Sequence, residues 1–324
     1  MRKRSFTTAT GLVLLAAYTA LGQTPKTWKT PRTPDGHPDL QGNWSNATIT
    51  PLERPAELAG KAVLTEKEAG DYERQSLKIN DRDRRDGAGT DADVSRAYNE
   101  FWYDRGTQTV KSRRTSLIVD PPDGRAPAIT ADGQAKLAAR AERRRLHPAD
   151  GPEDRGLSER CLNWMTAGPP MLPSAYNNDY QIIQTPDTIV ILNEMIHDAR
   201  IIPLDGRPHV PGAIHLWLGD SRGHWEGDTL VIDTTNLRDK AGLQGGLEAL
   251  HPTETTHLVE RFTRVDADTL LYEFTVTDPA MYTRPLTVQI PSVRITSPIY
   301  EYACHEGNYG MFGILSSARA EEKK

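Results

Sequence analysis

Hydrophobic and polar positions follow one pattern before residue 176 and another after it. The first part is rich in Pro and Gly, and it contains two segments typical of helices, residues 65–78 and 131–146. Thr65 and Glu68 have the spacing of a capping box, which predicts where the first of these helices starts. We therefore expect residues 23–175 to form an extended and helical N-terminal region.

From residue 176 onward, short β-branched runs alternate with turn dipeptides such as Asp205-Gly206 and Gly227-Asp228. The predicted strands cover residues 180–184, 188–195, 200–204, 215–218, 229–235, 256–264, 269–277, 286–290 and 299–304, and one more is predicted earlier, at 115–119. Hairpin-length links without helical segments between them are typical of antiparallel sheets. We expect a mainly β (α+β) fold, with an antiparallel barrel or sandwich over residues 176–324 and the N-terminal region packed on it.

The start of the chain has the pattern of a secretory signal peptide. Arg2, Lys3 and Arg4 precede a short apolar core, and Ala20 and Gly22 supply small residues at a cleavage site. The core is too short to span a bilayer, which needs about 20 apolar residues. The sequence thus predicts that residues 1–22 are removed and that the mature protein is periplasmic or secreted.

The cysteine content agrees with export. The chain has two cysteines, Cys161 and Cys304, far apart in sequence. In an oxidising compartment they predict one disulfide between the middle and the end of the chain. The alternative is a nucleophile or metal pair formed by Cys304 and His305, but the clustered spacing of metal sites is absent. We favour the disulfide and expect no metal site.

The candidate site residues of the β region are polar residues that are predicted to face the interior. Side chains alternate between faces along a strand, so an acidic residue in phase with apolar neighbours is expected to face inward. By this criterion Glu194, Glu260 and Glu301 face the interior, and His305 continues the face of Glu301. Asp233 is also in phase with an apolar neighbour, although the opposite face of its strand is equally apolar.

Buried carboxylates must be paired, hydrogen-bonded or protonated, because uncompensated desolvation is costly. In one interpretation each glutamate pairs with an internal arginine, the available ones being Arg200, Arg264, Arg294 and Arg319. In the other, the carboxylates line a polar cavity, where crowding separates their pKa values into an acid and a base. The candidate catalytic residues are then Glu260, Glu301 and His305, and the candidate ligand-binding residues are Glu194, Asp233 and Arg200.

Composition and motifs exclude several classes of protein. The formal net charge of −5 gives no electrostatic basis for binding nucleic acid. The chain has no Gly-x-Gly-x-x-Gly motif and no phosphate loop, so we expect no nucleotide cofactor, and indeed no cofactor at all. No segment after the signal peptide approaches the length of a membrane span.

Three segments, residues 38–44, 223–231 and 301–309, resemble a broad group of uncharacterised secreted bacterial proteins. The element Gly42-x-Trp44 and the series of predicted hairpins also resemble lipocalin-type β-barrels. The second resemblance implies a calyx with one ligand site.

Three functions are compatible with the sequence. The first is an exported barrel that binds a small polar or amphipathic molecule in a carboxylate-lined pocket. The second is an acid–base enzyme, a lyase, isomerase or hydrolase, which uses the same pocket with Glu260 or Glu301 as base and His305 as its proton-transfer partner. The third is an envelope interaction protein without a ligand, in which the interior charges are structural.

Overall fold

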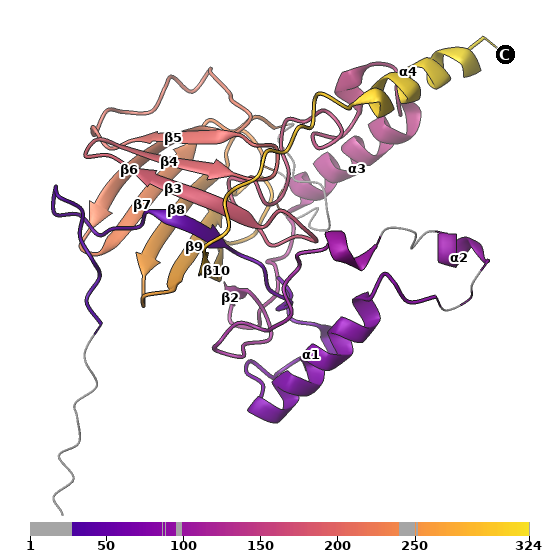
Figure 1. Ribbon diagram of the computed structural model, residues 1–324. Helices are drawn as coiled ribbons and strands as arrows, with labels where there is room; N and C mark the ends of the chain where they lie inside the picture. Colours follow the sequence, from indigo (N-terminus) through magenta and orange to yellow (C-terminus); the bar gives the residue numbers. More distant parts are fainter. Residues whose placement is uncertain are drawn as a thin grey trace, which may run out of the picture.

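The computed structural model describes residues 28–85, 87, 89–94, 99–239, 250 and 252–323. Its main feature is one antiparallel sheet of ten strands (Figure 1). The strands are β1 (Gly42–Ser45), β2 (Ile118–Asp120), β3 (Asp179–Gln184), β4 (Thr188–Asn193), β5 (Ala199–Pro203), β6 (Asp220–Glu226), β7 (Thr229–Thr235), β8 (His257–Arg264), β9 (Thr269–Thr277) and β10 (Leu286–Ile295). The helices are α1 (Glu66–Asn80), α2 (Asp91–Val94), α3 (Ala131–Leu146) and α4 (Tyr309–Glu321), with short 3-10 turns η1 (Ala56–Leu58), η2 (Glu100–Trp102) and η3 (Pro152–Asp154).

Helices α1 and α3 confirm the two helices predicted from the sequence. The hydroxyl of Thr65 accepts a hydrogen bond from the backbone N–H of Glu68, and the Glu68 carboxylate accepts one from the backbone of Thr65. Thr130 caps α3 in the same way, because its side chain accepts from the N–H of Gly133. These caps satisfy backbone donors that the first helical turn leaves free.

The strand order is β5-β4-β3-β1-β10-β9-β8-β7-β6, and β2 pairs with β10 outside this path. From β3 to β5, and from β6 to β10, each strand pairs with the next one along the chain. Strand β1 joins the two series because it pairs with both β3 and β10. No ladder joins β5 to β6 in the described part of the chain, so the sheet is not closed into a barrel. The prediction of a mainly β, antiparallel fold is confirmed, whereas closure is not observed.

The two ends of the sheet meet through side chains. A Cβ atom at Gly223 of β6 would lie 3.0 Å from the Ile202 side chain of β5 and 2.6 Å from that of Leu204, which follows β5, so the two edge strands are in close contact. Arg200 of β5 reaches across the concave side to Glu260 of β8. The sheet is therefore strongly curled, and its concave side encloses the core.

Aromatic side chains fill much of this concave side. Phe262 on β8 and Tyr272 and Phe274 on β9 are completely buried. The rings of Phe262 and Tyr272 stack with centroids 4.7 Å apart, and those of Tyr272 and Phe274 are 5.6 Å apart. Large rings packed at these distances contribute strongly to core stability.

The Gly42-x-Trp44 element forms β1 and is held by arginines. The Trp44 ring is fully buried, and its indole N–H donates to the carbonyl of Leu40 at 3.0 Å. The guanidinium groups of Arg294 and Arg264 lie 4.8 and 5.8 Å from the ring centroid. Gly42 has a φ of +127°, and a Cβ there would lie 3.1 Å from the Arg294 guanidinium. Glycine at position 42 thus leaves room for one of the two cation–π contacts.

A C-terminal strap, residues 296–308, leaves β10 and crosses the sheet before it enters α4 (Figure 1). The side-chain amide of Asn43 donates to the carbonyl of Ser297 at 2.7 Å, so the strap lies against β1. A disulfide joins Cys304 of the strap to Cys161, which confirms the pairing predicted from the sequence.

Two predicted strands do not form, and β6 and α4 are among the elements that were not predicted. Residues 299–304 belong to the strap, and within 215–218 only an isolated bridge from Leu216 to Leu237 is present. Strand β6 lacks an apolar alternation, because its inward positions include Ser221 and Gly223. Helix α4 contains two glycines, but its Asn308 side chain accepts from the N–H of Met311 and would have marked its start.

The predicted signal peptide, residues 1–22, lies outside the described residues. Among the helices that are described, none has the length and apolar character needed to cross a bilayer.

Candidate functional site

Glu260 lies in the core and forms a buried ion pair with Arg200. Two hydrogen bonds join the guanidinium to the carboxylate, at 2.7 and 3.2 Å, and the two side chains are 0% and 6% exposed. The Tyr272 hydroxyl donates to the same carboxylate at 2.7 Å and accepts from the backbone N–H of Met171 at 3.1 Å. Burial, together with the negative charge of Glu260, raises the pKa of Tyr272 well above its ordinary value. This arrangement corresponds to the ion-pair interpretation for Glu260, and it links the core to the loop that contains Met171.

Glu194 is buried, but not through the strand pattern used to predict it. Its expected in-phase neighbours, Val190 and Leu192, are only half-buried, and the fully buried positions of β4 are the alternate ones. Glu194 itself follows the end of β4, where Oε1 accepts from the Asn177 amide at 2.6 Å and Oε2 from the N–H of Tyr300 at 3.1 Å. Glu194 therefore anchors the strap.

Three carboxylates close to the start of β3 and the end of β4 interact electrostatically: Asp104, Asp179 and Glu194. Burial raises the pKa of Asp179 to about 6, with smaller contributions from the negative charges of Asp104 and Glu194, while a hydrogen bond from Ser45 opposes the shift. The pKa of Asp104, a more exposed residue, is also raised, by partial burial of its carboxyl and by Glu194. In the described residues, no Arg, Lys or His forms an ion pair with any of the three.

We expect Asp179→Asn to stabilise the protein at neutral pH. Because the folded-state pKa is raised above the ordinary value, the folded protein binds more protons than the unfolded chain between about pH 4 and 6, and stability falls as pH rises through that window. After allowance for partial exposure, the gain at pH 7.5 is roughly 1 kcal/mol, and it disappears near pH 4. Urea denaturation at both pH values measures the difference.

The matched control is Asp198→Asn, because Asp198 lies in the nearby turn after β4 and is exposed. It should change stability little at either pH. A gain for Asp179→Asn that is equal at pH 4 and pH 7.5 would contradict the electrostatic origin of the effect.

Glu301 and His305 do not face the interior, so their inward assignment is wrong. Both side chains are exposed on the strap, and the residues between them that are half-buried are Tyr302 and Cys304. The phase of the side chains is thus opposite to the predicted one, because the disulfide turns Cys304 toward the protein. These two residues are separated from Glu260, which is enclosed in the core.

Asp233 lies on the convex face of the sheet, between two histidines. Its oxygens lie 2.8 Å from His209 Nε2 and 2.6 Å from His257 Nε2, and His209 Nδ1 lies 2.7 Å from Asp220. A neutral imidazole has one N–H, so both contacts of His209 are hydrogen bonds only when the ring or one carboxyl holds an additional proton. Asp233 therefore belongs to a surface network that ties the β5–β6 connection to β7 and β8.

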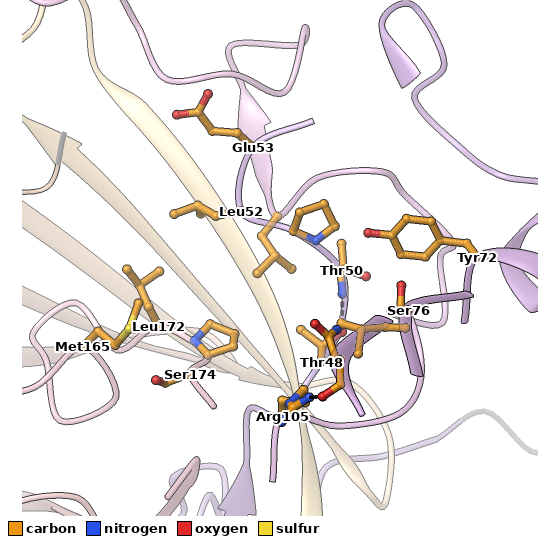
Figure 2. A pocket seen from close by; sticks show the side chains of 15 residues that line it. Thr48, Thr50, Leu52, Glu53, Tyr72, Ser76, Arg105, Met165, Leu172 and Ser174 are labelled. Carbon is orange, nitrogen blue, oxygen red and sulfur yellow. Dashed lines mark hydrogen bonds between the residues drawn. The ribbon is translucent and has the colours of Figure 1, made fainter. Parts of the chain in front are cut away.

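A pocket of about 500 Å3 lies between α1, the segment before η1, and the loop that precedes β3 (Figure 2). Its lining comes from stretches far apart in sequence: Thr48, Ile49, Thr50, Pro51, Leu52, Glu53, Tyr72, Ser76, Asn80, Arg105, Leu117, Met165, Leu172, Pro173 and Ser174. None of the six residues assigned from the sequence to catalysis or ligand binding lines it.

Backbone and side-chain hydrogen bonds hold the walls of this pocket. The N–H of Leu117 donates to the carbonyl of Pro51 at 2.8 Å, which pairs the first wall with the segment leading into β2. Glu73 of α1 accepts from the N–H and the hydroxyl of Thr109 at 2.9 and 2.8 Å, so the helix is fixed to the segment after η2. The third wall is the loop that contains Met171. The backbone N–H of Met171 donates a hydrogen bond to the hydroxyl of the buried Tyr272 at 3.1 Å.

The pocket has an apolar side and a polar side. Figure 2 shows Leu52, Met165 and Leu172 on one side and Tyr72 and Ser76 of α1 on the other. Burial raises the pKa of Tyr72, the negative charge of Glu57 adds to the shift, and the Ser76 hydroxyl opposes it through a hydrogen bond. The Tyr72 phenol therefore stays a neutral hydroxyl over the physiological range and can donate a hydrogen bond.

The sequence contained a weak signal of this site. Thr48 to Pro51 alternates hydroxyl-bearing and apolar residues, and Tyr72 and Ser76 are spaced i and i+4, which places them on one face of a helix. Neither signal says which of these segments meet in space.

No family model, curated protein or solved structure matches this chain. Within the described part of the chain, no group of three or more His, Cys, Asp or Glu side chains is arranged to hold a metal ion.

Proposed function

We propose that this protein is exported and binds a small amphipathic molecule in the pocket of Figure 2. The observation that carries the proposal is a hollow of about 500 Å3 with one apolar side and one side of hydroxyl groups. Ligand pockets have volumes of about 300–1,000 Å3 and combine an apolar lining with a few placed polar groups. Binding rather than turnover is favoured, because Glu260 is paired in the core while Glu301 and His305 are exposed on the strap.

Two features support export to the periplasm or the medium. The N-terminal sequence predicts a signal peptide, and the Cys161–Cys304 disulfide is of a kind that persists in oxidising compartments.

The first test uses Nile red, a neutral amphipathic dye, and the variant Ser76→Trp. We expect saturable dye binding to the wild-type protein and at least tenfold weaker binding to the variant, because an indole at position 76 projects into the pocket from α1. Fluorescence titration measures both affinities, and thermal unfolding in the presence of the dye should show a rise in Tm for the wild type alone.

Gln75→Trp is the matched control, because Gln75 is the neighbouring residue on α1, is exposed and does not line the pocket. It should bind the dye as the wild type does. If Nile red bound all three proteins equally, the dye would be reporting exposed apolar surface elsewhere and the proposed site would be wrong.

A further inference from the structure

Arg105 supplies the positive charge of the pocket. It lines one end of the pocket, and Figure 2 shows Glu53 at the opposite end. The Arg105 side chain is 17% exposed, so its charge is partly shielded from solvent. A cation in such a position interacts more strongly with a ligand than a fully solvated one does.

The Arg105 guanidinium is held in place before any ligand arrives. It lies over the Tyr103 ring, 4.1 Å from the centroid. Nη1 donates to the carbonyl of Asn80 at 2.7 Å, at the C-terminal end of α1, and Nη2 donates to the Glu100 carboxylate at 3.3 Å and forms an ion pair with it. A fixed side chain loses little further conformational entropy on binding, which favours affinity.

Within the part of the chain that the structure describes, the Arg105 guanidinium makes two hydrogen bonds. Arginine has five N–H donors, and Arg105 uses two of them, toward Asn80 and Glu100, among the described residues. The planar fork of arginine matches the two oxygens of a carboxylate. Glu53 at the other end is associated with Arg125 at 3.6 Å and would repel a second anionic group.

We infer that the ligand is an amphipathic monocarboxylate, an inference that rests on the proposed function of this pocket. Its carboxylate pairs with Arg105, and its apolar body lies against Leu52, Met165 and Leu172. The hydroxyls of Tyr72 and Ser76 face the other side of that body, and they fit a ligand with polar substituents along one edge.

The test compares 1-pyrenebutyrate with its methyl ester, two probes with the same apolar body that differ in charge. We expect the wild-type protein to bind the acid at least tenfold more tightly than the ester at pH 7.5 in fluorescence titrations. Arg105→Met should reduce the affinity for the acid about tenfold and leave the ester nearly unchanged, so that the preference disappears. Arg105→Lys should retain part of the preference, because it keeps the charge without the fork.

Arg82→Met is the matched control, since the Arg82 guanidinium also lies over the Tyr103 ring, at 5.5 Å, but does not line the pocket. It should keep the wild-type preference for the acid.

If the wild type binds acid and ester equally, or if Arg105→Met weakens both equally, the charge inference is overturned while ligand binding by the pocket stands. If neither probe binds and Nile red does not bind either, the proposed function itself fails. The wild-type affinities for acid and ester distinguish these outcomes even if an Arg105 variant does not fold.

Discussion

Replacement of Arg200 by methionine is expected to lower the free energy of unfolding by about 3–5 kcal/mol, because it leaves a buried carboxylate without its counterion. The Glu260 carboxylate is completely buried and receives two hydrogen bonds from Arg200 and one from Tyr272. In the variant only the Tyr272 hydroxyl remains. Urea denaturation followed by circular dichroism measures the loss as a lower midpoint with an unchanged slope.

The double variant Arg200→Met/Glu260→Leu separates the cost of an unpaired charge from the cost of altered packing. Because it removes both charges, it should be more stable than Arg200→Met alone, although Tyr272 then lacks an acceptor. Destabilisation equal to the sum of the two single variants would show that the pair is not coupled, and this account of the core would be wrong.

The same core network has a consequence for the pocket. Tyr272 joins the Glu260 carboxylate to the N–H of Met171, whose neighbour Leu172 lines the apolar side of the pocket. Loss of the ion pair should therefore also loosen the pocket wall. A pocket wall held from within the core suits a preformed ligand site.

Removal of the disulfide, in the variant Cys161→Ser/Cys304→Ser, is expected to lower the free energy of unfolding by about 2–5 kcal/mol. The two cysteines are separated by 143 positions, so the cross-link restricts a long loop of the unfolded chain. It also holds the strap against the body of the protein, where Tyr300 donates to Glu194. Chemical denaturation of the oxidised wild type and the variant gives the difference.

Reductant provides the control for the disulfide. Dithiothreitol should bring the wild type to the stability of the serine variant and leave the variant itself unchanged. In a thiol assay without reductant, the native protein should show no reactive thiols. Two reactive thiols in that assay, or equal stabilities of the oxidised wild type and the variant, would contradict the structural role of this bond.

Most local elements of this protein could be predicted from residue types and short spacings. Helix α1 could be predicted because Thr65 and Glu68 cap it through groups only three residues apart. Most strands could be predicted because turn residues bound short β-branched runs. The disulfide could be predicted because the chain has two cysteines, Cys161 and Cys304, and an N-terminal pattern that predicts export. Each of these depends on short spacings or on residue type, which a sequence displays directly.

The positions of the polar residues depend on how the strands and the strap pack together. Glu260 was predicted to face inward and does so, but its pairing with Arg200 depends on the curl of the sheet, which brings β5 opposite β8. Glu301 was assigned to the wrong face because the strap is not a strand. The disulfide of Cys304, and not strand alternation, sets which side chains of the strap face the protein. Period-2 alternation is informative only where a segment is paired in a sheet, and pairing is a long-range property.

The candidate pocket could not be predicted from the sequence, because it also depends on long-range contacts. Its walls join the segment at residues 48–53, helix α1, Arg105 and the loop at residues 165–174, and long-range hydrogen bonds such as that from Met171 to Tyr272 hold them. Residue types and local periods fix which side chains are available and which elements they occupy. Only the packing of those elements fixes which side chains share a hollow, because that depends on contacts between residues distant in the chain.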